Sequence, residues 1–229
     1  MKHNTRPNSL SHRFCKLFVV LFFMVIVHDS AHGKRKGTIH LEVHGGYASS
    51  SVNVVLGGDT QNYDFRGPQV SLDFGLRFGR RKITHDLSLN IQHFGLTNQY
   101  SAINSDNHIV TETLQILGGG FKYGLNGPLG RKFKRLGFLV SLNGGFYQAT
   151  LTREELQPDV QTYASGFGGI GSLALVFKLS RKKGSGAELI LGTSGTYILL
   201  SRGTDQNSRA RSDLAVTSGS GYLGLAINI

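Results

Sequence analysis

The segment Val70–Phe78, VSLDFGLRF, constrains the fold more than any other part of the 229-residue chain. Apolar side chains occupy every second position, and Ser71, Asp73, Gly75 and Arg77 stand between them. A period of two places the two kinds of side chain on opposite faces of a β-strand. The segment therefore predicts a strand with one apolar face and one polar face.

The same alternation recurs along the chain, and we find no stretch with the 3.6-residue period of a helix. The alternating stretches are residues 38–47, 69–78, 85–96, 113–125, 136–149, 167–179, 187–199 and 214–229. Short connections at 79–84, 126–135 and 180–186 alternate with longer ones at 48–68, 97–112, 150–166 and 200–213. This pattern is typical of a transmembrane barrel. We predict an all-β fold, an eight-stranded antiparallel transmembrane β-barrel with short periplasmic turns and longer extracellular loops.

The polar face indicates which face points outward, because a soluble ligand-carrying barrel alternates as well. That face consists mostly of Gly, Ser, Asn, Gln and Ala, which suit the crowded interior of an eight-stranded barrel. Nine alternating residues span roughly 30 Å, or about 23 Å along the membrane normal at a tilt near 40°, close to the usual apolar band of about 25 Å. We therefore expect the apolar face to contact lipid.

The first 33 residues have the composition of an export signal. A basic segment is followed by an apolar run of 11 residues, 17–27, and then by Ala31 and Gly33 before an expected cleavage site. As a helix the run rises about 16 Å, too short for a bilayer core of about 30 Å. We predict a signal peptide at 1–33 and one outer-membrane β-barrel domain at 34–229. The single cysteine, Cys15, would leave with the signal, so the mature barrel would have no disulfide and no thiolate metal site.

The formal net charge of +11 raises the question of a nucleic-acid partner. Thirteen bases occur in residues 34–36, 80–82, 131–135 and 181–183, which precede the first strand or fill the short turns, with no acid among them. A nucleic-acid surface would combine bases with aromatic residues in a groove. We expect instead a solvated periplasmic rim and no nucleic-acid partner.

The C-terminal strand, Tyr222–Ile229, alternates to its last residue, with Gly224 five positions from the end and apolar residues at Leu225, Ile227 and Ile229. It resembles the final-strand signal of bacterial outer-membrane proteins, although it ends on Ile where an aromatic residue is usual. The resemblance implies that Tyr222, Gly224, Ile227 and Ile229 form an assembly signal read by the outer-membrane assembly machinery. The whole mature chain is similar to small barrels of the OmpA/OmpX, OmpW or opacity-protein type.

Charged residues at inward positions form the candidate site. We predict a lumen polar network of Glu42, Asp73, Arg77, Asp86, Lys122, Lys178 and Glu188, with His40 and His44 nearby. Buried charges are costly unless they are paired, so we interpret the network as a plug of ion pairs. A narrow polar or proton pathway is the alternative. His85, His93 and His108 are too widely separated to indicate a metal site, and we predict no cofactor.

Some small barrels modify lipid A, but the deacylase kind needs a His and a Ser near the lipid face of late strands, and this chain has no His after His108. We therefore predict no enzymatic activity. Binding residues commonly lie on loops held by a rigid scaffold, which indicates a structural or surface-interaction role, resembling an adhesin or opacity protein, through the extracellular loops. The alternative is a narrow channel or hydrophobic-solute conduit. We expect a monomer in the bacterial outer membrane, surrounded by membrane lipids and lipopolysaccharide, with a host or envelope surface ligand at the loops.

Overall fold

The computed structural model describes residues 37–56, 59–79, 83–101, 109–130, 133, 135–154, 160–179, 186–202 and 213–229. They belong to one compact unit, Gly37–Ile229. The predicted signal peptide, residues 1–33, lies outside the described residues. So does most of the predicted basic rim, of which only Arg135 is described.

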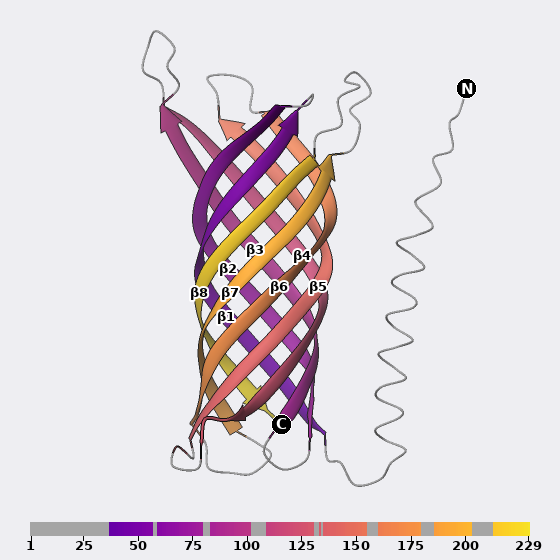
Figure 1. Ribbon diagram of the computed structural model, residues 1–229, viewed down its shortest axis with the longest axis vertical. Helices are drawn as coiled ribbons and strands as arrows, with labels where there is room; N and C mark the ends of the chain where they lie inside the picture. Colours follow the sequence, from indigo (N-terminus) through magenta and orange to yellow (C-terminus); the bar gives the residue numbers. More distant parts are fainter. Residues whose placement is uncertain are drawn as a thin grey trace, which may run out of the picture. The chain divides into compact units, whose positions relative to one another are not determined.

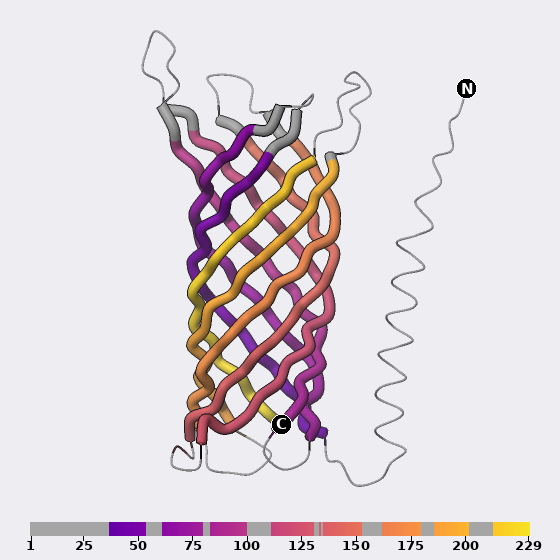
Figure 2. The backbone as a smooth tube through the Cα atoms, viewed as in Figure 1, coloured from indigo at the N-terminus to yellow at the C-terminus, as the bar shows by residue number. Residues whose placement is uncertain are grey.

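The strands close into one antiparallel barrel in sequence order, so that β8 pairs with β1 as well as with β7 (Figure 1). Figure 2 follows the tilted strands around the wall. Among the described residues, no helix is long and apolar enough to cross a membrane. The strands are β1 Thr38–Leu56, β2 Asp59–Phe78, β3 Thr84–Ser101, β4 Ile109–Pro128, β5 Leu136–Glu154, β6 Val160–Lys178, β7 Gly186–Arg202 and β8 Asp213–Asn228. The predicted eight-stranded antiparallel barrel is therefore confirmed.

The first and last described residues lie at one end, which we call the terminal end, and the opposite end is the loop end. In the terminal half of the barrel the predicted faces are present. In β2, for example, Leu72 and Phe74 are exposed on the outside, whereas Asp73 and Arg77 are buried inside. We call this outer surface the apolar band; its exposed members include Val43, Val70, Phe74, Leu89, Ile91, Leu142, Leu173, Leu191, Leu223 and Leu225.

Toward the loop end the two faces exchange their polarity while the strands continue. We call this part the collar; it comprises residues 48–53, 61–67, 94–99, 111–116, 147–152, 162–166, 198–201 and 213–218. Its outward positions carry polar side chains such as Ser49, Arg66 and Thr97. Its inward positions carry mostly apolar side chains, with Ser50, Glu112 and Ser218 as buried polar exceptions, so the alternation persists with the opposite phase.

The interior of the collar is a packed apolar cluster, which we call the collar core. Its members are Ala48, Val52, Phe65, Phe94, Leu96, Leu114, Ile116, Tyr147, Ala149, Ala164, Ile170, Ile198, Leu200, Leu214 and Val216. Burying these side chains from water stabilises the collar in the same way that a core stabilises a soluble barrel. A membrane is not needed to hold these strands together.

The strands of the collar show that the predicted loops were too long. Segments 48–68, 97–112 and 150–166 are mostly strand, whereas most of segment 200–213 lies between β7 and β8. The connections at the loop end are residues 57–58, 102–108, 155–159 and 203–212. Ser49 lies opposite Arg66, and Gln115 lies opposite Thr150, in regular antiparallel register. The prediction was wrong here because it required apolar residues on the outer face, and in the collar they lie on the inner face.

Candidate functional site

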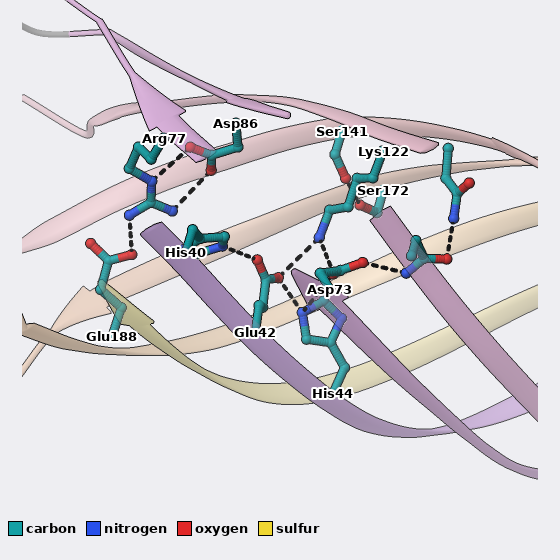
Figure 3. A network of polar contacts seen from close by, with 12 residues as sticks. His40, Glu42, His44, Asp73, Arg77, Asp86, Lys122, Ser141, Ser172 and Glu188 are labelled. Atoms are coloured by element: carbon teal, nitrogen blue, oxygen red, sulfur yellow. Dashed lines mark hydrogen bonds and ion pairs between the residues drawn. The ribbon is translucent and has the colours of Figure 1, made fainter. Parts of the chain in front are cut away.

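The inward charges of the terminal half meet in one cluster, which we call the lumen network (Figure 3). Its charged members come from five strands and are His40, Glu42, His44, Asp73, Arg77, Asp86, Lys122 and Glu188. Each of these side chains is at most 9% exposed. Inward positions of neighbouring strands lie side by side, so the cluster follows from the alternation and the closure of the barrel.

Arg77 joins three strands at the terminal end. Its Nε and Nη2 donate hydrogen bonds to Asp86 Oδ1 and Oδ2 over 2.6 Å and 2.9 Å, and its Nη1 donates to Glu188 Oε2 over 2.6 Å. The bidentate contact uses the planar fork of the guanidinium. Because β2 and β7 are not neighbours in the sheet, the contact between Arg77 and Glu188 crosses the lumen.

Lys122 joins β4 to β1 and β2 one level deeper. Its Nζ from β4 donates to Glu42 Oε1 on β1 over 3.1 Å and to Asp73 Oδ2 on β2 over 2.7 Å. Asp73 also accepts a hydrogen bond from Asn90 Nδ2, and Asn90 Oδ1 accepts one from Asn143 Nδ2. The hydrogen bonds therefore extend from β1 to β5 across the interior.

Glu42 is contacted by two histidines of its own strand. His40 Nε2 lies 2.7 Å from Glu42 Oε2, and His44 Nε2 contacts Glu42 Oε1. Residues two positions apart on a strand point to the same face, which brings the three side chains together. Both histidines also contact the last strand, His40 through Asn228 and His44 through Tyr222.

Lys178 is placed differently from the prediction. It is the last residue of β6 and stands opposite Glu188 in the register, yet its side chain is exposed. At a strand end a long lysine side chain can reach water, and the carboxylate of Glu188 is already bound by Arg77. The prediction that Lys178 belongs to the lumen network is therefore wrong, whereas its other six members lie together.

Glu42, His44 and Asp73 each offer a ligand atom within 4.8 Å of the other two, a spacing that a metal ion could use. The ammonium group of Lys122 already contacts both carboxylates. A cation placed among them would have to displace this charge. Glu42 and Asp73 therefore act as counter-ions of Lys122.

A cavity of about 40 Å³ separates the lumen network from the collar core. Asp73 and Lys122 form its terminal side, and Phe94 and Ile170 of the collar core lie on its loop side. Polar side chains line the rest, among them Gln69, Asn90, Gln92, Asn143, Ser172 and Ser194. A space of this size with polar walls can hold ordered water. Among the described residues the lumen is thus a polar compartment between a charged layer and an apolar layer.

The C-terminal strand presents its predicted signal residues to both faces. Tyr222 is buried and its ring stacks on that of His44, with centroids 4.8 Å apart. Gly224 leaves room for the same histidine, because a Cβ there would collide with the His44 ring. Ile227 and Ile229 are exposed on the outside. The N–H and C=O groups of Ile229 pair with those of Ile39 over 2.9 Å and 3.0 Å. That the assembly machinery reads these residues stays a prediction.

Sequence reasoning missed the neutral members of the interior. Ser88, Asn90, Asn126 and Ser141 are buried at inward positions. The alternation of the sequence could have identified them, because each occupies an inward position, as the charged residues do. The prediction considered charges alone and so left out the amides that connect them.

No family model and no curated protein matches the chain. Solved structures similar to it include the attachment invasion locus protein Ail of Yersinia pestis, crystallised with the heparin analogue sucrose octasulfate (12% identity, TM-score 0.39, 83% of this chain and 99% of that one). Neisserial surface protein A is similar over 84% of this chain and 98% of that one, with 9% identity and a TM-score of 0.44.

The outer-membrane protein OprG of Pseudomonas aeruginosa is similar over 86% of this chain and 98% of that one, with 11% identity and a TM-score of 0.43. These are surface and outer-membrane proteins, the group that the sequence resembles. At such identities and TM-scores the likeness carries no argument about what this chain binds or does.

Proposed function

We propose that the chain is an integral outer-membrane β-barrel protein with a structural or surface-interaction role, whose collar and loops stand outside the membrane. The observation that carries this proposal is the exchange of polarity along the strands. In the terminal half the outer wall is apolar and the inner wall carries the lumen network; in the collar the outer wall is mostly polar and the inner wall mostly apolar. An outer wall that passes from lipid into water has to change from apolar to polar.

The collar also supports a role at the surface. Its strands hold exposed polar side chains in fixed register, among them Asp64, Arg66, Thr97, Gln115 and Ser165. A packed interior makes this wall rigid, and a rigid wall binds a partner at a lower entropic cost than a mobile loop does. A host or envelope surface ligand would meet the collar as well as the loops.

Single-cysteine labelling tests the position of the barrel in the membrane. Cys15→Ser gives a background without thiols. Into it we would introduce Thr217→Cys in the collar, Leu173→Cys in the apolar band and Lys178→Cys at the terminal end, all exposed positions. With a membrane-impermeant maleimide on intact cells, Thr217→Cys should be labelled. Lys178→Cys should react only after the outer membrane is permeabilised, and Leu173→Cys only after denaturation.

Labelling of Leu173→Cys on intact cells would contradict a lipid-facing band. Labelling of Lys178→Cys with protection of Thr217→Cys would reverse the orientation. The two roles are then separated in a deletion strain. Loss of the outer-membrane permeability barrier supports a structural role, and loss of cell adhesion with an intact barrier supports a surface interaction.

A narrow channel or solute conduit has less support. Between the terminal end and the loop end, a solute would have to pass both the lumen network and the collar core. Insertion of the purified barrel into planar bilayers should give no stepwise conductance. Reproducible steps that collar-core substitutions enlarge would favour the channel instead.

A further inference from the structure

The joint between β1 and β8 closes the barrel, and we call it the seam. Two histidines of β1 make its inward side-chain contacts with β8: His40 with Asn228 and His44 with Tyr222. On the outside, Gly45 and Gly221 carry no side chain at mid-height. At this height the side-chain contacts that hold β1 against β8 therefore lie mainly on the inner face of the barrel.

The surroundings of His40 favour its charged form. Its Nδ1 lies 2.9 Å from Asn228 Oδ1 and its Nε2 lies 2.7 Å from Glu42 Oε2, and the residue is 1% exposed. Both partners are acceptor oxygens as the side chains are oriented. A neutral imidazole donates from one nitrogen only, and an imidazolium donates from both. The geometry fits the charged ring.

The charge balance of the lumen network leads to the same result. At the terminal end it contains the four carboxylates of Glu42, Asp73, Asp86 and Glu188, but only two basic side chains, Arg77 and Lys122. With neutral histidines the cluster would carry two uncompensated negative charges away from water. Such charges are strongly destabilising. A charged His40 ring halves this excess.

The histidines stand where these charges are needed. His40 faces Glu42 on its own strand and lies within electrostatic reach of Arg77 on β2 and Asp86 on β3. His44 faces Glu42 and, over 3.9 Å, Asp73 Oδ2, with the Lys122 ammonium on the same carboxylates. Each ring therefore connects the carboxylates of the interior to a residue of β8.

We propose that the seam is a pH-dependent latch, in which protonated His40 holds β1 against β8 and loss of its proton loosens the closure. Histidine is the side chain whose charge changes between about pH 5 and pH 8 in ordinary surroundings. The stabilisation is present in acid, where the His40 ring is charged. It is lost as the pH rises and that ring becomes neutral, because Glu42 then loses this counter-ion.

The test uses the full mature barrel refolded in detergent, with thermal unfolding followed by the mobility difference between boiled and unboiled samples. From about pH 8.5 to about pH 5.5 the midpoint temperature should rise by on the order of 5 °C or more. The variant His40→Gln should lose this rise. His93→Gln, on the exposed outer face, should keep it. A midpoint that does not change with pH, or a His40→Gln variant that retains the full rise, overturns the latch.

A second measurement does not depend on the folding of that variant. In the wild-type barrel with ¹⁵N-labelled histidine, NMR at about pH 6 should show both ring nitrogens of His40 protonated. A neutral tautomer of His40 overturns the proposal. Asn228→Asp, which adds a carboxylate beside His40 Nδ1, should move the midpoint-against-pH curve to higher pH, and a shift to lower pH argues against it.

Discussion

Arg77 and Glu188 are 111 residues apart in the sequence and form an ion pair with an N–O distance of 2.6 Å across the barrel interior. The same guanidinium holds Asp86 on the strand beside it. The Arg77 guanidinium thus pairs with one carboxylate on β3 and one on β7. It connects strands that no backbone hydrogen bond joins directly.

Replacing Arg77 with Gln should destabilise the barrel strongly. Asp86 and Glu188 would remain buried without their cation, and breaking a buried pair in this way costs about 3–5 kcal/mol. The free energy of unfolding in urea, measured on the barrel in lipid vesicles, gives the value. Lys178→Gln is the matched control, because Lys178 is exposed, and it should change that free energy by less than about 0.5 kcal/mol.

The triple variant Arg77→Gln/Asp86→Asn/Glu188→Gln also removes the two carboxylates that lost their cation. It should recover part of the lost stability. An Arg77→Gln barrel of unchanged stability that conducts ions would instead support a polar pathway through the lumen.

A glycine pair on β4 gives a second prediction. Gly118 points inward, and a Cβ there would overlap the ring of Tyr147, which is 1% exposed in the collar core. Gly119 points outward, where a Cβ would lie 3.7 Å from Asn90 O, an ordinary contact. Gly118→Ala should therefore cost about 1–3 kcal/mol through overpacking. Gly119→Ala should be neutral or slightly stabilising. Equal urea midpoints for the two variants would contradict this packing.

The collar core gives a third prediction. Leu96 is fully buried in it, whereas Leu89 on the same strand is 48% exposed in the apolar band. Leu96→Ala leaves a cavity and should lower the free energy of unfolding by about 2–5 kcal/mol. Leu89→Ala should cost clearly less, since lipid fills the space of the removed atoms. Urea unfolding in vesicles compares the two, and a larger loss for Leu89→Ala would mean that the collar is not packed as described.

These predictions depend on different amounts of sequence information. The terminal half could be read directly, because alternation alone assigns Phe74 to the outside and Asp73 to the inside. The collar could not, because a search for outward apolar residues discards a strand whose phase is reversed, such as the segment from Ser49 to Asn53. The sequence also could not pair Arg77 with Glu188. That contact depends on the closure and stagger of the whole barrel, which no local pattern contains.

The last prediction separates a lipid-facing band from a water-facing one. Leu173 is 61% exposed in the apolar band, and Thr217 is an exposed residue of the collar. In a soluble barrel both positions would meet water, and arginine would be tolerated at each. In a membrane barrel, arginine near the bilayer midplane costs about 2–4 kcal/mol and outside the lipid it costs about nothing.

Leu173→Arg should therefore destabilise the barrel in lipid vesicles, and Thr217→Arg should not. In a lipid-free detergent micelle the difference should shrink, because a micelle adapts its shape around a charge more readily than a bilayer does. If Leu173→Arg matches Thr217→Arg in vesicles, Leu173 does not face the hydrocarbon, and the outer wall would have to be assigned to water.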